Sequence, residues 1–346
     1  MFSFSASLRS RNLNLPFIRS QSAIHHGVIA YTGADDLRYL PHLREVEIRP
    51  VFIIGAHRSG TSILYRILAQ SGAFNQPSVF DVVKWARLLS LNDRGQIGAA
   101  HEELSEYLRN RGVTDRGYDA LPVTADSPVE YQVAFSTVSA RPVITDSNLE
   151  DFQLFCRKLT YLKGGARPLL LKNPYDAKHF LFLRRHIPNA RFIFIHRDPA
   201  QVISSQIEAI NGLLERKNEF EALLVERYRR LFENPIKLTL GRLLYSNRLP
   251  FLFRAVTHHH ATVCDYIVNH TRSLENTAVH VTYPALCNNP SAVVSQVFEF
   301  LKLGGGTSCV KSGMINRRER QLHPRVSKNL EAIYQRTRRF RTEFGV

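Results

Sequence analysis

Three short apolar runs, each followed by a pattern of helical period, constrain the fold of this 346-residue chain more than any other feature. The runs cover residues 49–55, 168–172 and 191–196, and the helical patterns cover 62–72, 176–186 and 199–214. Continuous apolar strands are buried on both faces, and strands that alternate with helices pair in parallel. We therefore predict an α/β fold of the three-layer P-loop type, with a central parallel sheet flanked by helices.

The rest of the chain differs in composition from this alternating region. The first 34 residues contain three arginines and no acid, so we interpret residues 1–35 as a basic arm that is either disordered or a presequence. We expect residues 36–346 to form a single domain. A helical insertion is predicted at 215–275, a candidate fourth strand at 279–283, a helix at 290–301, and a basic helical tail at the end of the chain.

The charge balance indicates an anionic partner. The chain has 46 Lys and Arg against 30 Asp and Glu, a formal net charge of +16. Such an excess is typical of proteins that bind a nucleotide, a nucleic acid, an anionic membrane or a glycan. We expect no nucleic acid, because helix-turn-helix, zinc-finger and RNP signatures are missing from the sequence. No apolar run is long enough to span a bilayer, although peripheral contact with a membrane stays open.

Composition also excludes several classes of protein and of site. With 44% hydrophobic residues, the chain can build a full core and is not globally disordered. Its four cysteines are scattered, which predicts neither a zinc site nor a redox motif and favours a reducing, cytoplasmic compartment. The triplet 258–260 is all histidine, but adjacent helical residues point in different directions. We therefore predict no metal.

The loop after the first predicted strand matches most of a phosphate-binding loop. Residues 55–62 read Gly-Ala-His-Arg-Ser-Gly-Thr-Ser, against the pattern G-x-x-x-x-G-K-[ST]. Amide groups at such a helix start point at a phosphate, and the helix dipole adds to the attraction. Thr61 replaces the lysine that reaches the γ-phosphate in ATPases and GTPases, and Arg58 lies inside the loop instead. We therefore expect a nucleotide with an anionic 5′ group and no γ-phosphate.

A second anion-binding element follows the third predicted strand. Arg197 leaves the strand, Pro199 suits the first turn of the next helix, and Ser204 and Ser205 lie two turns along it. An arginine and a serine at such a corner can hold a phosphate from two sides. Together with the first loop, this predicts a nucleotide that carries two separate phosphate groups.

These segments resemble one known family. The loop 55–62, the stretch Leu-Lys-Asn-Pro-Tyr at 171–175 and the stretch 188–205 resemble sulfotransferases that use 3′-phosphoadenosine-5′-phosphosulfate (PAPS), above all the broad bacterial group and the tyrosylprotein sulfotransferases. Weaker likenesses are found at 126–130 and within 281–301. The resemblance covers roughly residues 50–215 and 279–303, and it implies a PAPS-dependent sulfotransferase without a metal.

The resemblance also implies roles for individual residues. The first loop would hold the 5′-phosphosulfate, Arg197 and Ser205 the 3′-phosphate, and Lys172 the leaving oxygen. Basic residues of the tail, Arg317, Arg318 and Arg320, are a further candidate contact for the 3′-phosphate, or a solvated surface. The loop residues assigned to the cofactor are His57, Arg58, Ser59, Gly60, Thr61 and Ser62.

The general base has several candidates. Relatives carry a Glu some twenty residues after the loop, whereas the candidate here is Asp81. We rank Asp81 first, Glu130 second and His57 third, with Arg58 and Lys172 as the other catalytic candidates. Asp81 could equally begin a helix as its N-cap.

Two other classes of function compete with this interpretation. A P-loop kinase or NTPase would need the loop lysine and an acid for Mg²⁺ at a strand end, and the third strand ends in His196 and Arg197 instead. A non-catalytic basic module would explain the charge but not the two phosphate elements. The sequence predicts an acceptor hydroxyl or amine without identifying the acceptor, and it does not indicate an oligomeric state.

Overall fold

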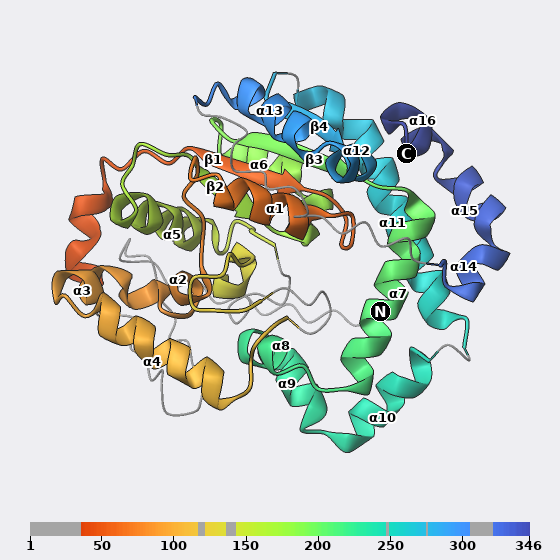
Figure 1. Cartoon of the computed structure of the whole chain (residues 1–346), viewed down its shortest axis with the longest axis horizontal. Helices are drawn as coiled ribbons and strands as arrows, with labels where there is room; N and C mark the ends of the chain where they lie inside the picture. The colour runs from red at the N-terminus through yellow and green to blue at the C-terminus, as the bar shows by residue number, and fades with distance from the viewer. Residues whose placement is uncertain (1–35, 117–121, 136–142, 247–248, 275, 305–320) are drawn as a thin grey trace, which may run out of the picture.

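Four parallel strands form the sheet around which the chain is built (Figure 1). The computed structural model describes residues 36–116, 122–135, 143–246, 249–274, 276–304 and 321–346. The strands lie in the order β2-β1-β3-β4, and every neighbouring pair is parallel. Their bounds are β1 Pro50–Ile54, β2 Leu169–Lys172, β3 Arg191–His196 and β4 Ala278–Thr282. The predicted α/β class is confirmed, and the candidate fourth strand is β4.

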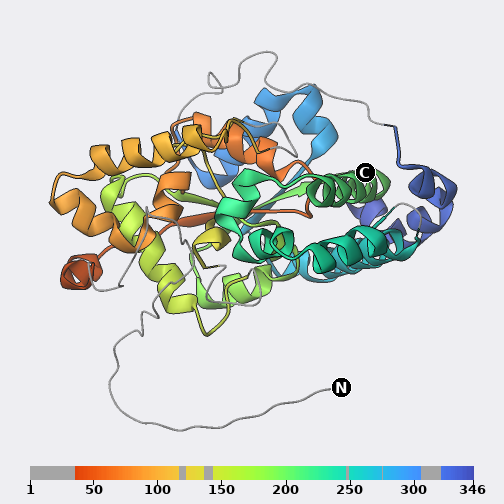
Figure 2. The ribbon, with the colours of Figure 1, turned by 90° about the horizontal axis from the view of Figure 1, so that it is seen from below.

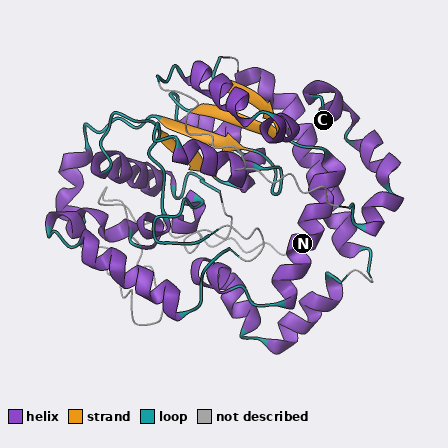
Figure 3. Cartoon of the chain, viewed as in Figure 1, coloured by secondary structure: helices purple, strands orange, loops and turns teal. Residues whose placement is uncertain are grey.

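Helices make up most of the rest (Figure 3). In the described part of the chain the α-helices are α1 Thr61–Gln70, α2 Val79–Val83, α3 Leu88–Asp93, α4 Ile97–Asn110, α5 Leu149–Leu162, α6 Phe180–His186, α7 Pro199–Glu215, α8 Glu219–Leu224, α9 Glu226–Phe232, α10 Pro235–Leu244, α11 Phe251–His270, α12 Tyr283–Asn288, α13 Pro290–Leu301, α14 Pro324–Lys328, α15 Leu330–Arg336 and α16 Arg338–Phe344. Short 3₁₀ helices cover Leu37–Leu43, Trp85–Arg87, Tyr131–Phe135, Pro174–Lys178 and Thr271–Leu274.

Alternate side chains of the strands enter two separate cores, one on each face of the sheet. Phe52 and Phe194 belong to the larger core, with residues of α2 to α6 and α11. Ile53 and Ile193 belong to the other, with α1, α12 and α13. All four side chains are fully buried, and each such burial contributes about 1.5–3 kcal/mol. The result is the predicted three-layer arrangement.

A third core attaches the C-terminal helices to α7 and α11. Ile203 and Ile207 of α7 and Leu252 of α11 pack with Val326 of α14 and Ile333 of α15. The turned view in Figure 2 shows α14–α16 gathered at the end of the molecule where α7 and α11 run side by side, and these two helices also share contacts. The described part of the tail is therefore helical and packed against the domain.

Proline and a polar cap set the starts of several helices. Pro199, Pro235 and Pro290 each occupy the first turn of a helix, where the missing N–H costs no hydrogen bond. At α7, the Asp198 carboxylate accepts a hydrogen bond from the Gln201 N–H at 2.9 Å. Pro235 therefore begins α10 within the predicted helical insertion.

One predicted helix begins differently from the expectation. The helix expected from Asp176 to His186 is a 3₁₀ turn, Pro174–Lys178, followed by α6. The Asn173 side chain caps this turn by accepting the Tyr175 N–H, and its amide also donates to the Asp176 carboxylate at 2.9 Å. These local hydrogen bonds favour a 3₁₀ turn over the first turn of an α-helix.

A stack of aromatic rings joins the last helix to the sheet. The Phe344 ring of α16 lies on His196 of β3 with 3.7 Å between centroids, and His196 Nε2 is 2.8 Å from His280 Nδ1 of β4. Burial lowers the pKa of His196 well below its usual value and that of His280 to about 4. Both rings are therefore neutral near pH 7 in the folded protein.

This stack predicts an acid-sensitive stability. Because the folded protein binds a proton at His280 less readily than the unfolded chain, stability is intact above pH 6.5 and falls as the pH drops toward about 4. We expect His280 to account for about 1–2 kcal/mol of lost unfolding free energy between pH 7 and pH 5. Urea unfolding should show that the unfolding free energy differs less between pH 7 and pH 5 in His280→Gln than in the unmodified chain. His258→Gln, at an exposed position, serves as control, and an equal effect of both variants would contradict the prediction.

Candidate functional site

The loop between β1 and α1 has a backbone that fits an anion. Gly60, with φ 105°, is the N-cap of α1, so the first amides of the helix have no acceptor within it. Arg58 also has a positive φ, 71°, which is uncommon for a residue with a side chain and typical of functional loops. The Ser59 N–H already donates to the Ala56 carbonyl at 3.1 Å. The Ile63 N–H donates to the Gly60 carbonyl at 3.1 Å, so the amides of Thr61 and Ser62 are the candidate anion-binding donors of this loop.

The two predicted phosphate elements are in direct contact. Arg58 Nε donates to Ser205 Oγ at 3.0 Å, and an Arg197 guanidinium nitrogen donates to the Arg58 carbonyl at 3.1 Å. Gln206 Nε2 donates to the His57 carbonyl at 2.8 Å, a contact that the sequence did not predict. Loop 55–62 and the start of α7 therefore form one continuous surface of donors and positive charge.

The two serines of α7 have different partners. Ser205 faces Arg58, whereas Ser204 Oγ accepts the backbone N–H of His323 at 2.8 Å, just before α14. The tail therefore fixes the helix from one side while Ser205 remains on the loop side. Arg317, Arg318 and Arg320, predicted as contacts of the 3′-phosphate, lie outside the described residues.

Tyr283 supports both arginine and loop. The Arg197 guanidinium lies over the Tyr283 ring, 4.2 Å from its centroid, a geometry that favours a fixed cation. A Cβ on Gly60 would overlap the same ring. Tyr283 was not predicted as a site residue, although it lies directly after a strand and within the weak family likeness at 281–301.

A buried row of three charges adjoins the loop at the end of β2. Lys172 Nζ donates to Ser62 Oγ at 2.8 Å and to the Glu130 carboxylate, and Arg116 donates to both Glu130 oxygens at 3.0 and 3.2 Å. Lys172 is 1% exposed. Burial alone would raise the pKa of Glu130, but Arg116 and Lys172 outweigh it and hold that pKa well below the usual range. Glu130 is therefore ionised at neutral pH.

His57 lies in the loop beside this charge row. Desolvation and the nearby Lys172 charge lower the pKa of His57 to about 4. Its ring meets the Tyr175 ring edge-on, with 4.5 Å between centroids. His57 is neutral near pH 7 and can donate or accept a hydrogen bond without adding charge.

Asp81 contacts residues that cap α2 and end α5. Its carboxylate accepts the Ser78 N–H at 2.8 Å, and its own N–H donates to Ser78 Oγ at 3.1 Å, which is a complete capping box at the start of α2. Lys163 of the α5 C-terminus forms an ion pair with the same carboxylate. Asp81 therefore caps a helix, as the alternative interpretation held. It does so from the third position of α2, because Ser78 is the N-cap.

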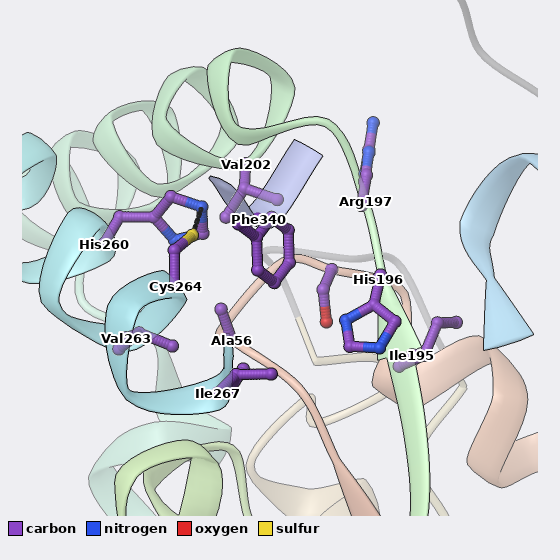
Figure 4. Close-up of a pocket in the computed structure, with 11 residues that line it drawn as sticks. Ala56, Ile195, His196, Arg197, Val202, His260, Val263, Cys264, Ile267 and Phe340 are labelled. Carbon is purple, nitrogen blue, oxygen red and sulfur yellow. Dashed lines mark hydrogen bonds between the residues drawn. The ribbon is translucent and has the colours of Figure 1, made fainter. Parts of the chain in front are cut away.

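A small cavity lies behind the loop (Figure 4). It has a volume of about 10 Å³, close to what one water needs. Ser59 Oγ and His260 Nδ1 are buried without a hydrogen-bond partner among the described residues, and both residues line this cavity, as does Cys264. The cavity is too small for a nucleotide, so it is not itself a candidate nucleotide site.

Two further observations concern metals and membranes. Within the described ranges, no cluster of three or more His, Cys, Asp or Glu side chains could hold a metal ion. His258 is exposed and His260 buried on α11, so these two face apart as predicted. No described helix combines the length and hydrophobicity needed to cross a membrane.

Comparisons with known proteins agree with this geometry. A family model described as the sulfotransferase family matches residues 50–304. The sulfotransferase STF9 from Mycobacterium avium has a similar structure, with a TM-score of 0.57 and 17% identity over 89% of this chain and 80% of that one. The sulfotransferase STF1 from Mycobacterium tuberculosis H37Rv is also similar in structure, with a TM-score of 0.56. Its sequence identity is 13%, over 88% of this chain and 80% of that one. At such identities the structures show a shared fold, and none of the curated proteins matches.

The contact between Gly60 and Tyr283 predicts an unequal cost for two glycine substitutions. Gly60→Ala adds a methyl group at positive φ and against the ring that supports Arg197, whereas Gly72→Ala adds one at φ 72° with nothing within 4 Å. We expect the free energy of unfolding to fall by about 1 kcal/mol in Gly72→Ala and by at least about 2 kcal/mol in Gly60→Ala. Urea unfolding measures both, and equal losses would show that the contact adds nothing.

Proposed function

The chain belongs to the sulfotransferase family, and from that premise we propose that it transfers the sulfuryl group of PAPS to a hydroxyl or amine of an acceptor. The observation that carries the proposal is the direct contact of Arg58 with Ser205 and of Arg197 with the Arg58 carbonyl. A nucleotide with phosphate groups at both its 5′ and its 3′ position would meet cations and helix amides at both ends of this surface.

The loop chemistry favours PAPS over a nucleoside triphosphate. Thr61 replaces the lysine that reaches a γ-phosphate, and Lys172 instead approaches the loop from β2 through Ser62. A lysine in this position would contact the oxygen that bridges the 5′-phosphate and the sulfuryl group. Its ammonium would stabilise the charge that develops on this oxygen as the bond breaks.

The reaction is an in-line displacement at sulfur. The acceptor oxygen or nitrogen forms a bond to sulfur while the bond from sulfur to the bridging oxygen breaks, and 3′-phosphoadenosine-5′-phosphate leaves with the electron pair. The acceptor proton passes to a base. We assign Lys172 to the leaving oxygen and Glu130, its ion-pair partner, to the acceptor proton.

The position of Glu130 between two cations would allow its basicity to rise during the transfer step. Two cations, Arg116 and Lys172, hold its pKa low. When Lys172 turns toward the leaving oxygen, Glu130 loses one of these cations, and its affinity for a proton rises. Asp81 lacks such a link to Lys172 because its contacts are with Ser78 and Lys163, so the geometry ranks Glu130 ahead of Asp81. His57 would act as a neutral donor to the sulfuryl oxygens.

Calorimetric titration tests the donor. We expect 3′-phosphoadenosine-5′-phosphate to bind without magnesium and more tightly than 5′-AMP, and Arg197→Ala to weaken binding by about 10–100-fold, the cost of one charge-assisted phosphate contact. Arg94→Ala removes the same charge at an exposed site after α3 and should bind like the unmodified chain. ATP with magnesium binding as well as the bisphosphate would overturn the proposal in favour of a kinase.

Paired variants test the base. Glu130→Gln should reduce kcat for sulfuryl transfer by about 10²–10⁴, the usual contribution of a positioned base. Asp81→Asn should leave kcat within a few-fold of normal and instead lower stability by about 1 kcal/mol through its capping box. Transfer of labelled sulfate from PAPS in an acceptor screen measures the first effect, and bisphosphate binding confirms that each variant is folded. The reverse result, with kcat lost only in Asp81→Asn, would assign the base to Asp81.

A further inference from the structure

The helix α10 presents a row of large apolar side chains to solvent. Ile236 is 82% exposed, Leu243 58% and Leu240 54%, and Leu244 is 38% exposed beside them. No residue of α10 is buried. We call these four residues the α10 face. Single exposed leucines are common on protein surfaces, but a continuous apolar row on one helix indicates an interaction site.

The helix has a second, separate side that packs on the domain. Leu238, Gly241 and Tyr245 are partly buried, and a Cβ on Gly241 would lie 3.9 Å from Leu214 of α7. At about 100° per residue, the α10 face lies roughly opposite these residues. Figure 1 shows α10 at the lower rim of the molecule, beside α9 and the end of α7. The α10 face therefore points away from the core that holds the helix in place.

Further exposed apolar side chains follow α10 in the sequence. The Phe251 ring at the start of α11 lies 5.9 Å from the Tyr245 ring between centroids, and Phe251 is 52% exposed. Leu249, just before α11, is 38% exposed. Because Tyr245 lies on the packed side of α10, these residues add exposed apolar surface next to the end of the helix and are not part of the α10 face itself.

Charge distinguishes the partners that this surface could accept. From Asn234 to Cys264 the sequence has four Lys or Arg and no Asp or Glu, and the chain as a whole carries +16. Lys237 is exposed beside the α10 face. A second copy of the chain would bring another basic surface against this one, whereas an anionic lipid surface would attract it.

We propose that the α10 face docks the protein onto the surface of an anionic lipid bilayer, with α10 lying in the interfacial plane. Apolar side chains on one side of a helix with flanking cations are the pattern of interfacial helices. Since α10 has only ten residues, its attachment is peripheral, reversible and sensitive to salt. The proposal does not depend on the reaction assigned above, because bisphosphate binding and vesicle binding are measured separately.

Sedimentation with vesicles tests the proposal on the full chain. Vesicles of phosphatidylcholine and phosphatidylglycerol at about a 2:1 ratio should bind the protein, vesicles of phosphatidylcholine alone should bind it much more weakly, and salt at about 1 M should release it. The variant Leu240→Asp/Leu243→Asp should bind anionic vesicles at least about tenfold more weakly. Both positions are more than half exposed, so the urea unfolding of this double variant should match that of the unmodified chain.

A matched variant controls for the added negative charge. Leu37 and Tyr161 are exposed apolar residues elsewhere, at 44% and 49%. Leu37→Asp/Tyr161→Asp should keep vesicle binding within about twofold of normal. Equal weakening of both double variants, or no binding of the unmodified chain to anionic vesicles, would overturn the proposal. A dimer in sedimentation equilibrium that only Leu240→Asp/Leu243→Asp separates, without vesicle binding, would reassign the face to a second copy.

Discussion

The position of β1 between β2 and β3 is the constraint on which the rest of the site depends. Ile53 pairs with Lys172 on one side and with Ile193 on the other, so the loop after β1 emerges between the ends of its two neighbours. Ligands of parallel sheets bind where strands end and connections diverge. Lys172 and Arg197 consequently approach the same loop from opposite sides, although they are far apart in the sequence.

The buried charges near the loop are costly in stability unless all of them are present. Lys172, Glu130 and Arg116 are each under 10% exposed. Pairing offsets the desolvation of such ions only in part, and removing one member typically costs about 3–5 kcal/mol because it leaves an unpaired buried charge. A row in which one carboxylate serves two cations is stable only while both are present. The same coupling means that the pKa of Glu130 depends on both Arg116 and Lys172.

Helix α7 connects three features that are otherwise separate. Its start contributes Ser205 to the loop and Ser204 to the tail, and its end supports α10. Arg242 of α10 donates to the carbonyls of Leu214 and Glu215 at the C-terminal end of α7, at 2.8 and 3.0 Å. These contacts fix α10 to the same helix that carries Ser205 against the loop.

The sequence by itself determined the strands, the helices that follow them and the turns that join them. Each of these depends on residues within one short segment: apolar runs, a glycine loop, or proline and an acceptor at a helix start. Local chemistry is sufficient there, so the turn before α1 and the start of α7 could be predicted from the residues alone. Phosphate binding by these segments stays a prediction. The one local error was the start of α6, where side-chain bonds of Asn173 favour a 3₁₀ turn.

Only the tertiary structure decided which acid adjoins Lys172. Glu130 and Lys172 are 42 positions apart, and Asp81 and Lys163 are 82 apart, so neither pairing leaves a periodic or local trace in the sequence. Arg116, Gln206 and Tyr283 entered the site in the same way, by the packing of distant segments against the ends of strands. The physical reason is that ion pairs and ring contacts depend on where side chains meet in space, whereas strands, caps and loops depend on neighbours along the chain.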